Sequence, residues 1–288
     1  MKPFSRIISG TMTWGDWGKK LSLSEMQVLI EKSFNYGVST FDHADIYGGY
    51  TTEADFGNAF KTCSIDRENV QFITKCGIQM PCEARPLNVK YYDYSSSHIR
   101  LSVENSLRNL KTEYIDLLLL HRPSPLMEAS EICDIFYKLR EEGKVNQLGV
   151  SNFTTSQIKL LQKEISLNWN QIECSLSHET PLFNGVLDYL KTQNIGVMSW
   201  SPLGIYFKSD LPKKIRIKKV ITPLCKKYNC SEAQILLAWL LQHPSKIYPV
   251  IGTTSSDRIK KAIEATKINL DLTDWFLLLE ASMGKPLP

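Results

Sequence analysis

Eight segments in which a strand pattern precedes a helix pattern constrain this chain more than any other feature. Short apolar runs typical of strands begin near residues 6, 38, 70, 114, 146, 169, 195 and 247. Most of them are followed by apolar residues at helical spacing. Eight such units in one uninterrupted chain are typical of a (β/α)8 TIM barrel, whereas a doubly wound sheet would carry a G-x-G-x-x-G turn, which this sequence lacks. We therefore expect a single barrel domain over residues 1–288.

Three further segments add detail to this expectation. Residues 76–96 are rich in Pro and Tyr without clear periodicity, so we expect a long loop over one mouth of the barrel. Residues 273–288 are expected to form a C-terminal helix and tail. The continuous apolar run from Tyr114 to Leu120 predicts a strand that is buried on both faces.

Composition and charge exclude several classes of protein. No apolar run reaches about 18 residues, so no membrane-spanning helix is expected. The net charge of +4 is too small to argue for nucleic acid binding, and the basic run Lys213–Lys219 is interpreted as a solvated face, with attraction of a polyanionic cofactor as the alternative. The seven cysteines include no C-x-x-C pair, which predicts reduced thiols in a cytoplasmic protein. Nothing in the sequence indicates an oligomeric state.

Four chemically active residues stand at or just after the ends of expected strands. Asp42, Lys75 and His121 end the second, third and fourth strands, and Tyr47 lies in the glycine-rich turn after the second. Residues at the carboxyl ends of barrel strands converge on one bowl. A phenol with a pKa of about 10 needs a nearby cation to donate a proton at neutral pH. The four residues together predict that Tyr47 acts as an acid and that Lys75 is the cation beside it. They also predict that the Asp42 carboxylate positions the Lys75 ammonium and that His121 orients a carbonyl.

Two alternatives compete for the same residues. Asp42, His43 and Asp45 could be the metal ligands of a barrel hydrolase, but the ammonium of Lys75 would repel a divalent ion, so we expect no metal. The chain could also be a nucleotide-binding regulatory or redox-sensing subunit with little turnover. A protein that only binds would have no need of a phenol paired with a lysine.

Six motifs, in order over nearly the whole chain, resemble the aldo-keto reductase superfamily. They are F-D-H-A-D-I-Y-G (Phe41–Gly48), I-T-K (Ile73–Lys75), Y-I-D-L-L-L-L-H-R-P (Tyr114–Pro123), K-V-N-Q-L-G-V-S-N-F (Lys144–Phe153), W-S-P-L-G (Trp200–Gly204) and I-G-T-T-S-S-D-R-I (Ile251–Ile259). The run H-R-P-S-P-L-M (His121–Met127) resembles one bacterial branch whose physiological substrates are poorly defined. The resemblance implies reduction of aldehydes or ketones to alcohols by hydride transfer. It also implies Tyr47 as general acid, tuned by Lys75 and Asp42, with His121 orienting the substrate carbonyl.

The resemblance further implies a site for NADP(H). Ser151 and Asn152, with Gln171 beside them, match the residues that bind the carboxamide of a nicotinamide. A helix N-cap is the alternative interpretation of the Ser151–Asn152 pair. Trp200 matches an aromatic residue that stacks on the nicotinamide ring. Contacts to the pyrophosphate and at the end of the first strand are implied for Ser201, Leu203, Gly204, Gly10, Thr11 and Met12.

Cofactor selectivity depends on the last motif. Many NADPH-specific members carry a lysine where this chain has Gly252, directly before the hydroxyl of Thr253. Arg258 is retained, and its planar guanidinium suits a phosphate, although it could simply face solvent beside Asp257. We therefore expect NADPH over NADH, with Thr253 and Arg258 at the 2′-phosphate.

The substrate is expected to be a small carbonyl compound in an apolar or aromatic pocket. Most loop aromatics are interpreted as packing residues, and Trp14 as the one that lines the pocket. The others are Trp17, Tyr50, Tyr91, Tyr92, Tyr94, Tyr206 and Phe207.

Overall fold

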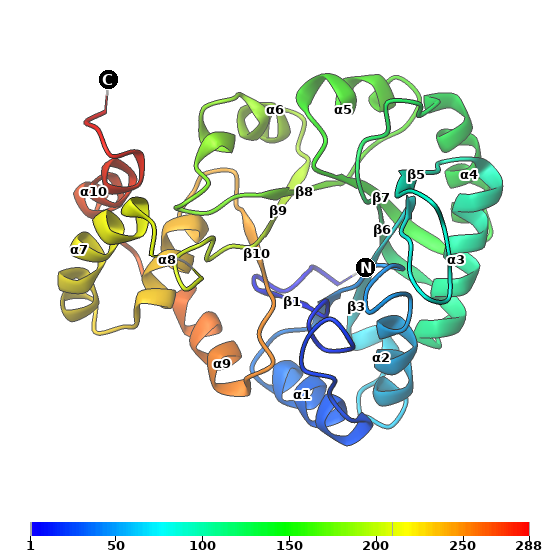
Figure 1. Ribbon diagram of the computed structural model, residues 1–288, viewed down its shortest axis with the longest axis horizontal. Helices are drawn as coiled ribbons and strands as arrows, with labels where there is room; N and C mark the ends of the chain where they lie inside the picture. Colours follow the sequence, from blue (N-terminus) through cyan, green and yellow to red (C-terminus); the bar gives the residue numbers. More distant parts are fainter. Residues whose placement is uncertain (1, 209, 288) are drawn as a thin grey trace.

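The barrel predicted from the sequence is confirmed by a computed structural model, which describes residues 2–208 and 210–287. Eight parallel strands close in the order β1-β10-β9-β8-β7-β6-β3-β2, and helices surround them (Figure 1). Each strand begins within two residues of its predicted start. The strands are β1 (Ile8–Gly10), β2 (Thr40–Asp42), β3 (Gln71–Cys76), β6 (Ile115–Leu120), β7 (Val145–Ser151), β8 (Trp169–Glu173), β9 (Gly196–Trp200) and β10 (Tyr248–Ile251).

Ten α-helices and two short 3-10 helices are found among the described residues. The α-helices are α1 (Leu23–Asn35), α2 (Thr52–Phe60), α3 (Ser96–Leu110), α4 (Ala129–Glu141), α5 (Thr155–Gln162), α6 (Val186–Thr192), α7 (Pro212–Lys227), α8 (Glu232–Leu241), α9 (Ser256–Ala265) and α10 (Leu272–Met283). The 3-10 helices are η1 (Arg67–Asn69) and η2 (Thr180–Leu182). The basic run Lys213–Lys219 lies on α7, which packs against the C-terminal helix α10 at one end of the molecule (Figure 1). None of the helices described is both long and apolar enough to cross a membrane.

Strand β6 shows why the strands are so apolar. Leu117 and Leu119 join an inner cluster built largely from strand residues of the barrel. Leu118 and Leu120 instead pack in the layer between the barrel and its helices. Because both faces of the strand are buried, every position is apolar except Asp116, which accepts hydrogen bonds from Arg67 and from the backbone N–H of Phe72.

The segment 76–96 is more ordered than the sequence predicts. It contains the antiparallel pair β4 (Ile78–Gln79) and β5 (Tyr91–Tyr92). The hydroxyl of Tyr50 accepts from the backbone N–H of Met80 at 2.9 Å and donates to the carbonyl of Ile78 at 3.4 Å. These contacts fasten the pair to the turn that carries Tyr47, so the excursion is part of the wall of the bowl.

Candidate active site

Three adjacent strands bring the predicted acid–base residues together. Asp42 is the last residue of β2, Lys75 lies near the end of β3, and His121 directly follows β6. The strands pair in register, and the backbone N–H of His121 continues the ladder by donating to the carbonyl of Cys76 at 3.0 Å. The side chains therefore meet at the carboxyl-terminal mouth of the barrel, where barrel enzymes place their chemistry.

Lys75 is the centre of this cluster. Its Nζ donates to Asp42 Oδ2 at 2.7 Å, to the backbone carbonyl of His43 at 2.7 Å and to the Tyr47 hydroxyl at 3.2 Å. An ammonium has three N–H donors, so all three are used. The Lys75 side chain is only 1% exposed, which makes the pair with Asp42 a buried ion pair.

Tyr47 is held by a tight turn between β2 and α2. Its backbone carbonyl accepts from the N–H of Thr52, the first residue of α2. Gly48 follows with φ of +63°, and a Cβ there would lie 2.5 Å from the Thr52 hydroxyl, so the turn requires glycine. The buried phenol ring has Lys75 on one side and the His121 ring at 6.1 Å between centroids.

The electrostatics of the cluster favour a protonated phenol beside a permanent cation. Burial raises the pKa of the Tyr47 phenol above its ordinary value, although the Lys75 ammonium opposes this. Burial also disfavours the charge on Lys75, but Asp42 and Tyr47 outweigh it and raise the pKa of Lys75. At neutral pH the phenol therefore keeps its proton, and the neighbouring charge stabilises the phenolate once the proton has left.

His121 is neutral at physiological pH. Burial lowers the pKa of its imidazole well below the usual value, and the charges of Lys75, Arg122 and Lys90 lower it further. Its Nδ1 is buried without a partner among the described residues. A neutral imidazole carries one N–H, which suits hydrogen bonding to a carbonyl oxygen.

Gln171 has a contact that the sequence did not reveal. Its Nε2 donates to Asp42 Oδ1 at 2.8 Å, while Asp42 Oδ2 accepts from Lys75. The amide predicted beside the cofactor is therefore hydrogen-bonded to the carboxylate of Asp42. Gln171 fixes the orientation of Asp42 from β8, across the barrel from β2 and β3.

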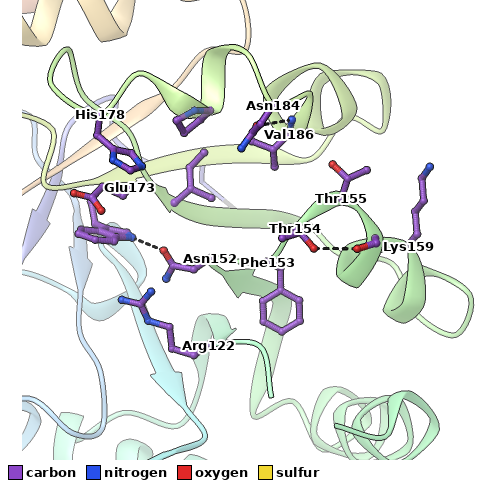
Figure 2. A pocket seen from close by; sticks show the side chains of 14 residues that line it. Arg122, Asn152, Phe153, Thr154, Thr155, Lys159, Glu173, His178, Asn184 and Val186 are labelled. Carbon is purple, nitrogen blue, oxygen red and sulfur yellow. Dashed lines mark hydrogen bonds between the residues drawn. The ribbon is translucent and has the colours of Figure 1, made fainter. Parts of the chain in front are cut away.

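The pair predicted to hold a nicotinamide is joined to Trp200. The Trp200 indole N–H donates to Asn152 Oδ1 at 2.8 Å (Figure 2). Asn152 Nδ2 donates to the Ser151 hydroxyl at 2.8 Å. Ser151 in turn donates to the backbone carbonyl of Gln171 at 3.0 Å. The N-cap interpretation of Ser151 and Asn152 is wrong, because Thr154 caps α5.

The loop after β9 is held in one conformation by its backbone angles and by close contacts. Ser201 and Gly204 have φ of +49° and +53°. A Cβ at Gly204 would lie 1.8 Å from the Ser177 hydroxyl, and that hydroxyl accepts from the backbone N–H of Ile205 at 3.1 Å. Glycine is therefore required for the loop to approach the segment after β8. The half-buried Leu203 lies in the same loop.

The residues at the end of β1 differ in their accessibility. Gly10 and Thr11 are buried, and the Thr11 hydroxyl is engaged by the carbonyl of Asp42 and the ring of His43. Met12 is 46% exposed. Of the three, Met12 therefore presents its side chain most openly.

The loop after β10 leaves room for a charged group. An added Cβ at Gly252 would meet nothing within 4 Å. Arg258 lies in the first turn of α9, is exposed and makes no ion pair or hydrogen bond with the residues described. Thr253 is half-buried, and its hydroxyl accepts from the backbone N–H of Ser255.

The structure does not bring Trp14 into the bowl. Trp14 is fully buried, with its ring 6.3 Å from that of Phe41 and 6.0 Å from that of Phe56. Trp17, three residues later, is 41% exposed and lies 6.0 Å from the Tyr47 ring. Trp17 is therefore the tryptophan of this loop beside the phenol of Tyr47.

Two of the three residues of the alternative metal site are engaged elsewhere. Asp42 is bonded to Lys75 and Gln171, and the buried ring of His43 contacts the hydroxyl of Thr11 at 2.9 Å. Within residues 2–208 and 210–287, no group of three or more His, Cys, Asp or Glu side chains is arranged to hold a metal ion.

Comparison with known proteins agrees with this geometry. The sequence model described as "Aldo/keto reductase family" matches residues 6–281. The chain belongs to this family. Among curated relatives, the oxidoreductase YdhF of Escherichia coli is 39% identical over 99% of this chain and 96% of that protein. A 6-dehydroglucose reductase of Agrobacterium fabrum is 39% identical over 98% of this chain and 95% of that protein.

The fold of this aldo/keto reductase also matches solved structures. An aldo/keto reductase from Klebsiella pneumoniae, in complex with NADP and acetate, aligns with a TM-score of 0.78. The alignment covers 99% of this chain and 93% of that one at 22% identity, which supports the shared barrel alone.

Proposed function

We propose that this aldo/keto reductase reduces aldehydes or ketones to alcohols with NADPH, and that Tyr47 supplies the proton. The position of Lys75 supports this proposal most strongly. Its Nζ lies within hydrogen-bond distance of both the Asp42 carboxylate and the Tyr47 hydroxyl, in a buried site. A phenol that is held against a buried cation can release a proton and tolerate the charge left behind.

The residues around the bowl suit a nicotinamide dinucleotide. Asn152 fixes the indole of Trp200, which offers a flat apolar face for stacking. The open space at Gly252 leaves room for a phosphate, and Arg258 is free to meet the 2′-phosphate. When it is bound, NADPH supplies the hydride that adds to the carbonyl carbon.

The chain's own residues handle the proton. Negative charge develops on the carbonyl oxygen as the carbon is reduced, and a ring N–H of neutral His121 together with the Tyr47 hydroxyl stabilises it. Tyr47 transfers its proton to that oxygen, which completes the alcohol. The phenolate that remains is stabilised by Lys75 and regains a proton from solvent.

Replacing Tyr47 with Phe tests the proposal. Tyr47→Phe removes the transferable proton, so we expect kcat to fall at least about 100-fold while NADPH binding is retained. The reaction is followed at the nicotinamide absorbance with a panel of aldehydes. A sugar-derived aldehyde belongs in the panel, because one relative is named a 6-dehydroglucose reductase. NADPH binding is measured by fluorescence titration.

Tyr91→Phe is the matched control, because Tyr91 is exposed on β5. It should turn over like the wild type. Near-normal turnover in Tyr47→Phe would contradict the assignment of the acid. A wild-type protein that binds NADPH but reduces no aldehyde would instead favour the regulatory or redox-sensing alternative.

A further inference from the structure

Two of the seven cysteines lie at the junction of α7 and α8, outside the proposed active site. Cys225 is in the last turn of α7, and Cys230 directly precedes Ser231, the N-cap of α8. The two helices pack against each other at one end of the molecule (Figure 1). Both cysteines are half-buried free thiols, and the proposed carbonyl chemistry uses neither of them.

The backbone between the two cysteines forms a Schellman turn, a common way for a helix to end. The N–H of Cys230 donates to the carbonyl of Cys225 at 3.0 Å. Inside this bond, the N–H of Asn229 donates to the carbonyl of Lys226 at 3.4 Å. Asn229 has a φ of +47°, the left-handed conformation that such a turn requires. The two residues joined by the outer hydrogen bond commonly have side chains in contact, and here both of them are cysteines.

The positions of the two thiols suit a disulfide. Cys225 and Cys230 both pack against the hydrophobic cluster between the barrel and its helices, so their side chains face the same part of the core. Burial and the neighbouring Cys225 thiol raise the pKa of Cys230 to about 11. A disulfide needs two Cα atoms about 4.4–6.8 Å apart, a separation that a direct backbone hydrogen bond between the residues provides.

The turn is held on both sides of the pair. The Tyr228 hydroxyl donates to Asp274 Oδ2 at 2.5 Å and accepts from the N–H of Asp271 at 2.8 Å, which fastens the end of α7 to α10. On the other side, the N–H of Ser231 donates to Gln234 Oε1 at 3.0 Å in the capping box of α8. Because the flanking backbone is already ordered, joining the two sulfur atoms costs little further conformational entropy.

We propose that Cys225 and Cys230 are a reversible modification site, at which a low-molecular-weight disulfide such as glutathione disulfide oxidises the two thiols to an intramolecular disulfide. One cysteine thiolate attacks glutathione disulfide, whose S–S bond breaks, so a mixed disulfide forms and one glutathione leaves. The second cysteine thiolate attacks the protein sulfur of this mixed disulfide, and the second glutathione leaves. The protein gives up two electrons and its two thiol protons, and glutathione disulfide becomes two molecules of glutathione.

Peptide mapping tests for this bond directly. Burial raises the pKa of both thiols, so the protein is incubated with glutathione disulfide at about pH 8.5, where more thiolate is present. Remaining thiols are then alkylated, and the protein is digested with trypsin, which cleaves after Lys226 and Lys227 between the two cysteines. The disulfide should link the peptide of residues 220–226 to that of residues 228–246, and dithiothreitol should separate them.

Three serine variants provide the comparison. Cys225→Ser and Cys230→Ser should lose the linked peptides. They should also accumulate at least about tenfold more glutathione adduct on the remaining cysteine than the wild type, because no second thiol resolves it. Cys63→Ser is the matched control, since Cys63 is half-buried after α2 and should not affect the link. Absence of the linked peptides from the oxidised wild type, or stable glutathione adducts on both cysteines, would overturn the proposal.

Thermal unfolding shows whether the disulfide suits the folded turn. A disulfide that fits the native geometry stabilises the protein by constraining the unfolded chain, so Tm of the oxidised wild type should rise by at least about 2 °C. Cys225→Ser treated in the same way should show no such rise. An unchanged or lower Tm in the oxidised wild type would mean that the disulfide distorts the turn, and would overturn the geometric argument. Neither measurement uses turnover, so failure of the proposed function would leave both of them unaffected.

Discussion

At the scale of single residues, Arg258 is the side chain that we propose to determine cofactor choice. The 2′-phosphate is the only group that separates NADPH from NADH, and Gly252 supplies no side chain to meet it. Arg258 is exposed in the first turn of α9, and no carboxylate among the described residues pairs with it. A guanidinium without a protein partner near a helix N-terminus suits a phosphate.

Replacing Arg258 with Met should reduce selectivity for NADPH. One charged contact contributes about 1.5–3 kcal/mol, so we expect kcat/KM for NADPH to fall by at least about tenfold while that for NADH changes little. Lys260→Met, on the same helix, should leave the ratio unchanged. Equal use of both cofactors by the wild type, or equal losses in Arg258→Met, would show that Arg258 does not contact the phosphate.

Some site residues could be predicted from the sequence and others could not. Asp42, Lys75 and His121 could be, because the end of a strand fixes where a side chain points in a barrel. Trp14 and Trp17 lie in one loop, and only tertiary packing decides that Trp14 turns into the core. The contact between Gln171 and Asp42 joins positions 129 residues apart, so no local pattern contains it.

At the scale of elements, the close approach of α2 and α3 helps to place the turn that carries Tyr47. Gly57 of α2 faces the end of α3, and an added Cβ would lie 2.0 Å from the backbone carbonyl oxygen of Asn109. Helix α2 begins at Thr52, whose N–H donates to the carbonyl of Tyr47. The seating of α2 on α3 is therefore coupled to the position of the phenol.

Gly57→Ala should destabilise the protein although alanine is the better helix former. Its propensity gain is about 1 kcal/mol, but overpacking against backbone that cannot move aside costs more. After the propensity gain is subtracted from an overpacking cost of about 1–3 kcal/mol, we expect the free energy of unfolding to fall by up to about 2 kcal/mol in urea titrations. Asn58→Ala, at the next and exposed position, should not lower it. Stabilisation of Gly57→Ala would refute the close contact.

Elements differ in how far the sequence specifies them. The longer barrel strands could be located closely because burial on both faces leaves continuous apolar runs, as in β6. The β4–β5 pair could not, because its anchor is the hydroxyl of Tyr50, a contact made only in the folded chain. Its two strands of two residues each are also too short to show a period.

At the scale of the whole molecule, buried ionisable groups concentrate on one sector of the barrel. Asp42, Lys75 and His121 come from β2, β3 and the end of β6, and His43 directly follows β2. A fully buried group whose pKa is shifted couples the stability of the entire fold to pH. Burial lowers the pKa of His43 well below its usual value, and Lys75 and Arg67 lower it further.

The fold should therefore lose stability in acid through His43. Below about pH 6.5 a histidine in the unfolded chain binds a proton, whereas His43 in the folded protein does not. The unfolded state then holds more protons, so the free energy of unfolding falls as pH falls, by up to about 1.4 kcal/mol per pH unit for one histidine. Buried His121 contributes in the same direction, whereas Asp45 and Glu53, whose pKa values burial raises, contribute in the opposite one.

Comparison of the wild type with His43→Asn isolates one histidine from these opposing groups. Asn can keep the contact with the Thr11 hydroxyl, which lies 2.9 Å from His43 Nδ1, but it cannot take up a proton. Urea unfolding of both proteins between pH 7.5 and 5 should show the wild type losing its advantage over the variant as pH falls below about 6.5. Parallel stability curves would mean that the pKa of His43 is the same in the folded and unfolded states, which its complete burial and the nearby charge of Lys75 argue against.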